Sequence, residues 1–137
     1  MMFLKNFLVS AIAFAILDFI WLGFVMKKFN LRHLSEIGRI VDGDFQVHYG
    51  AAFIVYILMS LGVVIFVAPL AGSSVVKAIG LGAFMGLLVY GVFDMTNMAI
   101  LKNYSWAFAL ADMAWGVFVF AAVSAITVWS AVKFNNI

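Results

Sequence analysis

Three aspartates stand alone in long apolar stretches of this sequence, each with polar or aromatic neighbours at short spacing. Asp18 and Asp112 each begin an Asp-x-x-Trp pattern that ends at Trp21 and Trp115. Asp94 has three polar neighbours in its own segment, namely Tyr90, Thr96 and Asn97. Carboxyl groups in apolar surroundings can bind a proton or a cation, or act as general acids and bases.

The composition determines where these aspartates must lie. Of the 137 residues, 67% are hydrophobic and only 10% are charged, whereas a soluble domain has about 25% charged residues. We therefore expect an integral membrane protein whose first partner is the lipid bilayer. The eight basic residues are spread over the ends and loops, which excludes a nucleic-acid-binding face. The absence of cysteine excludes thiolate chemistry.

Four apolar runs are each long enough to cross a hydrocarbon core of about 30 Å as a helix. The predicted spans are residues 6–26, 49–69, 77–101 and 107–129. They predict an all-α membrane protein, a single domain over residues 1–137 folded as an antiparallel four-transmembrane-helix bundle. Gly82 and Gly86 form a small-xxx-small pair that permits close helix contact. The short turn at residues 102–106 predicts a tight hairpin of the third and fourth spans.

The first loop, residues 27–49, is the only long hydrophilic connection. Asn30 is predicted to cap a short amphipathic helix that lies along the membrane surface. Its apolar side would carry Leu31, Leu34, Ile37 and Val41. The Asp42-Gly43-Asp44 turn would then lead the chain back into the bilayer.

The distribution of Lys and Arg predicts an orientation in the membrane. Five basic residues flank the first and third loops, at positions 27, 28, 32, 39 and 102, whereas positions 5, 77 and 133 carry the other three. The positive-inside rule places the richer side in the cytoplasm and both termini outside.

The three aspartates are predicted to lie at one depth. Asp18 and Asp94 come eight and seven residues before the ends of their spans, and Asp112 comes about six after the start of its span. At about 1.5 Å per residue, all three lie roughly 9–12 Å inside the membrane surface on the side of the first loop. The predicted site is an acidic cup with hydrogen-bonding partners and a tryptophan rim: Tyr56, Tyr90, Thr96 and Asn97, with Trp21, Trp106 and Trp115.

The negative charge of such an acidic cup must be neutralised or stabilised by hydrogen bonds. An ionised Asp at mid-span costs about 2.5–3.5 kcal/mol, and no basic residue lies at this depth; the nearest candidate, Lys102, is expected at the surface. The carboxyls could be protonated, held by Trp, Asn, Thr and Tyr donors, or joined by an external cation. A divalent cation would find hard oxygen ligands in Asp18, Asp94, Asp112 and Asn97; no other cofactor is expected.

The same motifs carry a resemblance to a known family. The stretches Leu17-Asp-Phe-Ile-Trp-Leu-Gly23, Tyr90-Gly-Val-Phe-Asp-Met-Thr-Asn-Met-Ala99 and Asp112-Met-Ala-Trp-Gly116 resemble the bacterial membrane proteins catalogued as domain of unknown function 2177. Phe93 stands where the family pattern suggests a tyrosine, and Ala107 where it suggests a proline. The resemblance implies a four-helix bacterial membrane protein and no function.

Three functional hypotheses remain open. The first is a proton- or cation-linked binder or transporter of a small molecule or lipid. A homodimer is expected in that case, because one subunit of this size scarcely forms a complete pathway. The second is an intramembrane enzyme that uses paired Asp side chains as acid and base on a lipid-soluble substrate. The third is a structural or regulatory subunit in which Asp and Trp side chains clamp helices together.

Overall fold

The computed structural model describes residues 1–135 and contains, within them, four helices long and apolar enough to cross a membrane. These are Met2–Val25, Tyr49–Ala71, Val75–Ile100 and Trp106–Phe134. Each overlaps one predicted span, and the largest difference is at the end of the fourth, which continues from residue 129 to 134. The predicted all-α membrane fold is confirmed.

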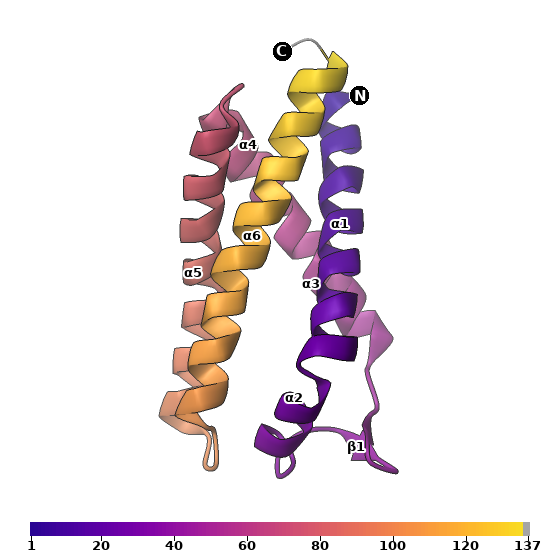
Figure 1. Ribbon diagram of the computed structural model, residues 1–137, viewed down its shortest axis with the longest axis vertical. Helices are drawn as coiled ribbons and strands as arrows, with labels where there is room; N and C mark the ends of the chain where they lie inside the picture. The colour runs from indigo at the N-terminus through magenta and orange to yellow at the C-terminus, as the bar shows by residue number, and fades with distance from the viewer. Residues whose placement is uncertain (136–137) are drawn as a thin grey trace.

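The long helices run in alternate directions, with the start of the first and the end of the fourth at one end of the molecule and the first loop at the other (Figure 1). The first span comprises α1 (Met2–Ile20) and the π-helical segment η1 (Trp21–Val25). The second comprises α3 (Tyr49–Gly62), the π-helical segment η2 (Val63–Val67) and α4 (Ala68–Ala71). The third is α5 (Val75–Ile100), and the fourth is within α6 (Trp106–Asn135).

The π-helical segment η1 begins three residues after Asp18. Its wider turn is visible in the backbone bond from Met26 N to Trp21 O, which spans five residues at 2.8 Å. Such segments change the direction of side chains beyond them and are frequent at functional sites. The sequence pattern, read at the ordinary helical period, did not predict this change.

The first loop differs from the predicted interfacial helix. Its helix α2 spans Lys27–His33, so Asn30 lies buried inside the helix and does not cap it. The later residues form a small antiparallel hairpin of β1 (Ile40–Val41) and β2 (Asp44–Phe45). The β-branched pair at 40–41 favours a strand over a helix. Leu31 remains in α2, whereas Leu34, Ile37 and Val41 follow it.

The predicted turn in this loop is confirmed. Asp42 and Gly43 both have positive φ, at 51° and 83°, which is typical of a two-residue type I′ hairpin turn. Lys27 Nζ lies 2.8 Å from Asp44 Oδ1, so the hairpin is tied to the start of α2. His48 Nδ1 accepts the backbone N–H of Ala51 at 3.1 Å and caps α3.

The helices α5 and α6 pack closely along small residues, as the sequence predicted. A Cβ added at Gly86 would overlap the backbone of Gly116, and one at Gly82 would overlap the Phe120 carbonyl and Ser124. Gly116 in turn leaves room for the ring of Tyr90. The hairpin is closed by the five residues 101–105.

We expect Gly86→Ala to separate α5 from α6 and to lower the free energy of unfolding by about 1–3 kcal/mol, the range for overpacked cores. Gly80→Ala is the control, because nothing lies within 4 Å of an added Cβ at that position. It should leave stability unchanged or raise it by about 0.5–1 kcal/mol through helix propensity. Unfolding in detergent, followed by circular dichroism, measures both. Equal stability of the two variants would contradict close packing at Gly86.

The bundle is closed on one side and open on the other. The buried core joins α1, η2 and α6, with the rings of Phe14 and Phe120 edge to face at 4.9 Å. By contrast, α3 packs along α1 and makes at most slight backbone contact with α5 and α6. Figure 1 shows α3 diverging from α5 toward the end with the first loop.

Candidate functional site

The side chain of Asp94, on α5, is completely buried and only half partnered. Its Oδ1 accepts a hydrogen bond of 2.6 Å from the hydroxyl of Tyr104, in the loop between α5 and α6. Its Oδ2 has no hydrogen-bond partner within residues 1–135. The Tyr104 hydroxyl also interacts with the side chain of Asn97. Burial, and then the bond to Asp94, raise the pKa of the Tyr104 phenol, so Tyr104 remains a proton donor.

Asp112, on α6, lies beside Asp94, and the two carboxyl groups interact directly. Asp112 is half-buried. Two adjacent carboxylates without a counter-ion repel each other strongly in low-dielectric surroundings. The Asp94–Asp112 pair is therefore suited to sharing a proton or to holding a cation.

Asp18 has different surroundings, because indole and phenol groups hold it. Its Oδ1 accepts a hydrogen bond of 2.8 Å from Trp115 Nε1, so α1 is tied to α6. Trp115 stacks on Trp21, with ring centroids 4.3 Å apart and the planes at 2°. The hydroxyl of Tyr56, on α3, also interacts with Asp18. This is the geometry of an interhelical clamp.

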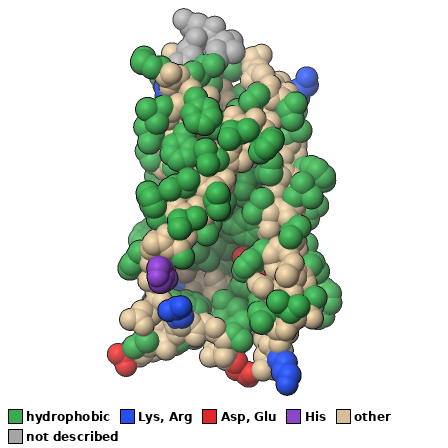
Figure 2. Space-filling model, turned by 180° about the vertical axis from the view of Figure 1, so that it is seen from behind, with side chains coloured by type: hydrophobic (Ala, Val, Ile, Leu, Met, Phe, Trp, Pro, Cys, Tyr) green, Lys and Arg blue, Asp and Glu red, His purple; other side chains and the backbone are tan. Residues whose placement is uncertain are grey.

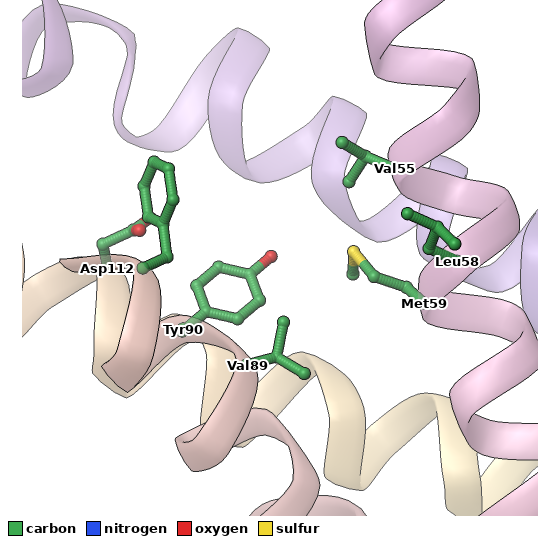
Figure 3. Close-up of a pocket in the computed structure, with 7 residues that line it drawn as sticks. Val55, Leu58, Met59, Val89, Tyr90 and Asp112 are labelled. Carbon is green, nitrogen blue, oxygen red and sulfur yellow. The ribbon is translucent and has the colours of Figure 1, made fainter. Parts of the chain in front are cut away.

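Tyr90 lies near both the clamp and the carboxyl pair. It is within electrostatic range of Asp18, Asp94, Asp112 and Tyr56. Figure 3 shows its hydroxyl pointing into a cavity between α3 and α5. This hydroxyl makes no hydrogen bond to any described residue, so it is available to a ligand.

Two predicted members of the site are exposed. The side chain of Thr96 is exposed on α5. Trp106 is 61% exposed at the start of α6. Lys102, the candidate counter-ion, is also exposed. Within residues 1–135, no three His, Asp or Glu side chains come close enough to hold a metal ion.

Two cavities meet at Asp112. The first, about 330 Å³, is lined by Val55, Leu58 and Met59 of α3, by Val89, Tyr90 and Phe93 of α5, and by Asp112 (Figure 3). The second, about 360 Å³, lies toward the first loop and includes Arg39, Gln46, His48 and Asp112 in its lining. Figure 2 shows a hollow near the loop end, with His and basic side chains at its edge and an acidic side chain inside.

Tyr104 is the site residue that sequence reasoning missed. It stands in a short polar turn, Lys102-Asn-Tyr-Ser-Trp106, that we interpreted only as a connection. Its spacing of ten residues from Asp94, across a helix end, gave no periodic signal. One feature of the sequence could have indicated Tyr104. It is a tyrosine immediately outside a span that carries a buried carboxyl, and a phenol on a short turn can fold back over the helix end.

Four apolar helices around a layer of buried carboxyl, phenol and indole groups define a polytopic integral membrane protein. A family comparison agrees, since residues 3–129 match the family described as "Predicted membrane protein (DUF2177)". The chain belongs to this family, as the motifs around Asp18, Asp94 and Asp112 suggested. No curated protein and no solved structure matches the chain.

Proposed function

We propose that the protein is a proton- or cation-linked binder or transporter of a small molecule, with the Asp94–Asp112 pair as its site. The observation that carries the proposal is the buried Asp94 carboxyl, whose Oδ2 lacks a partner among residues 1–135, beside Asp112 at the wall of a cavity. No Lys, Arg or His lines that cavity. Arg39 and His48 line the loop-side cavity together with Asp112 but form no ion pair with it, so the proposal takes the proton or cation that neutralises the pair from outside.

The residues of the site have separate roles in this proposal. Asp112, which borders both cavities, contacts the ligand, and Asp94 shares its proton. Tyr104 orients the Asp94 carboxyl through its hydrogen bond. Tyr90 offers a hydroxyl to the ligand. Asp18 is left out, because its bond to Trp115 already serves helix packing.

The exchange of a proton for a cation follows from electrostatics. A ligand with positive charge beside Asp112 replaces the proton that suppresses repulsion in the pair, so binding releases the proton. The groups that face Asp112 are Asp94 and Tyr90 from α5, Asp18 from α1, and Tyr104 from the loop between α5 and α6, with Arg39 and His48 across the loop-side cavity. The proposal assigns the exchange to the two carboxyls of the pair.

The site lies nearer the membrane surface on the side of the first loop. With the charge distribution of the loops, we propose that this side is cytoplasmic and that the membrane is a bacterial inner membrane. We also propose that transport, as opposed to binding, requires a second copy of the chain, because the core of Phe14, Val63 and Phe120 blocks the other half of a single bundle.

Infrared spectroscopy of the protein in lipid nanodiscs tests the shared proton. We expect a protonated-carboxyl C=O band that diminishes as the pH rises, and that also weakens at fixed pH when methylammonium or a monovalent metal cation is added. Asp94→Asn and Asp112→Asn should each weaken the band and change the pH at which it diminishes, since the one carboxyl that remains no longer has a like-charged neighbour. Asp44→Asn, on the exposed hairpin, should leave the band and its titration unchanged. A band with unchanged intensity and unchanged titration in both site variants would overturn the proposal.

A further inference from the structure

We infer that the ligand is a single-chain amphiphile with a cationic ammonium head, which enters from the bilayer between α3 and α5 and places its head at Asp112. This inference rests on the proposed function, because it identifies the class of molecule that the carboxyl pair binds. The shape of the cavity and the chemistry of its walls indicate this class of ligand.

The cavity between α3 and α5 opens sideways, toward lipid. Four of its lining side chains are large, apolar and exposed on the outside of the bundle, namely Val55, Leu58, Val89 and Phe93, at 48%, 61%, 41% and 56%. The slight backbone contact between α3 and α5 leaves this side unsealed. A molecule already dissolved in the hydrocarbon can enter here, whereas a hydrated ion cannot cross such a wall cheaply.

The cavity also extends inward in an apolar direction. A smaller space of about 100 Å³ shares Leu58, Met59 and Val89 with it and continues to Gly62, Met85 and Phe120. No charged side chain lines this inner space. The two adjoining spaces, which share these three wall residues, together offer an apolar groove that suits an alkyl chain.

The polar end of the groove determines the charge of the head. Its only ionisable lining groups are Asp112 and Tyr90, and Asp94 adjoins Asp112. An ammonium head would supply both positive charge and N–H donors to these oxygens, which a carboxylate or phosphate head could not do. Arg39 and His48 line only the loop-side cavity, so an ammonium head has its favourable partner at Asp112 and not nearer the surface.

Binding of radiolabelled dodecylammonium to the full chain in lipid nanodiscs, with empty nanodiscs subtracted, tests the inference. Dodecanoate tests the sign of the head, and methylammonium tests the need for a tail. We expect saturable binding of dodecylammonium and no binding of dodecanoate at the same concentration. Methylammonium should compete at least tenfold more weakly, because it leaves the apolar groove empty.

Two neighbouring residues on α5 provide a matched pair of variants. Val89 lines the groove, whereas Leu88 lines neither of its two cavities, and both are large apolar side chains on the exterior. Val89→Trp should weaken dodecylammonium binding about tenfold or more by filling the groove, and Leu88→Trp should not change it. Asp112→Asn should cause a loss of similar size.

The outcomes separate the two proposals. If methylammonium binds as tightly as dodecylammonium and Val89→Trp has no effect, while Asp112→Asn still changes the carboxyl titration, the amphiphile is wrong and the carboxyl site stands. If dodecanoate binds as well as dodecylammonium, the charge assignment is overturned. If dodecylammonium does not bind and Val89→Trp converts a dimer to a monomer, a second copy fills the groove and the inference fails.

Discussion

Trp115→Ala will lower the free energy of unfolding by about 3–5 kcal/mol, the range for removing a buried large aromatic side chain. The indole is 7% exposed and packs in the core cluster with Phe14 and Phe120. It also stacks on Trp21 and donates to Asp18. The substitution therefore leaves a cavity and a buried carboxyl oxygen without its indole donor. Unfolding in mixed detergent micelles, followed by circular dichroism, measures the loss.

Two further variants separate packing from hydrogen bonding. Trp115→Phe keeps an aromatic ring but removes the N–H donor, and should cost about 1–3 kcal/mol. Trp106→Ala removes a tryptophan that is 61% exposed and should change stability by no more than about 0.5 kcal/mol. If Trp115→Ala and Trp106→Ala were equally stable, the clamp at Asp18 would not contribute to the fold.

Tyr104→Phe will destabilise the protein by about 1–3 kcal/mol, although it removes a single oxygen atom. That hydroxyl donates the 2.6 Å hydrogen bond to Oδ1 of Asp94, whose side chain is fully buried. Without it, Asp94 Oδ1 loses this donor, while Oδ2 already has no hydrogen-bond partner among residues 1–135. Thermal unfolding of the protein in detergent measures the change. Tyr49→Phe removes a hydroxyl from an 81% exposed tyrosine and should have no measurable effect.

A double-mutant cycle assigns this loss to the contact. Once Asp94 is replaced by leucine, Tyr104→Phe should cost much less, because no buried carboxyl then needs the hydroxyl. An undiminished cost of Tyr104→Phe in the Asp94→Leu background would show that Tyr104 acts through some other contact. The infrared titration of the carboxyl pair should also shift in Tyr104→Phe, which a purely packing role would not cause.

The spans and the common layer of carboxyls could be predicted because both depend on fixed lengths. A helix rises by a constant amount per residue, and every span crosses the same hydrocarbon thickness. Counting from the span ends therefore predicted one depth for Asp18, Asp94 and Asp112, and all three lie within electrostatic range of Tyr90. The contact at Gly86 was predictable for a similar reason, because only small residues allow helices to approach so closely.

The pairing within that layer could not be predicted, because it depends on how each helix is rotated. The repeated Asp-x-x-Trp pattern suggested carboxyls and indoles that clamp helices together, but it did not indicate which carboxyl binds which indole. In the structure, Asp18 of α1 accepts a hydrogen bond from the indole of Trp115 on α6, and Trp21 stacks on that indole from the π-helical segment. Thr96 and Asn97 are adjacent in sequence, yet Thr96 is exposed and only Asn97 reaches Tyr104.

The first loop shows the limit of local periodicity. Apolar residues at helical spacing favoured a helix from Asn30 to Val41, but the strand preference of Ile40 and Val41 and the two-residue turn after them gave a hairpin. In short segments a turn with well-defined backbone geometry determines the structure more strongly than a weak apolar pattern does.

The hydrogen bond between Tyr104 and Asp94 determines the length of the loop between α5 and α6. Five residues reverse the chain, and within them Tyr104 reaches back to Asp94 inside the membrane. One inserted residue can displace the chain by about 3.3 Å, more than a hydrogen bond tolerates. We therefore expect the first loop to tolerate insertions and deletions. The loop between α5 and α6 should not tolerate them, because its Tyr104 must reach the buried carboxyl of Asp94.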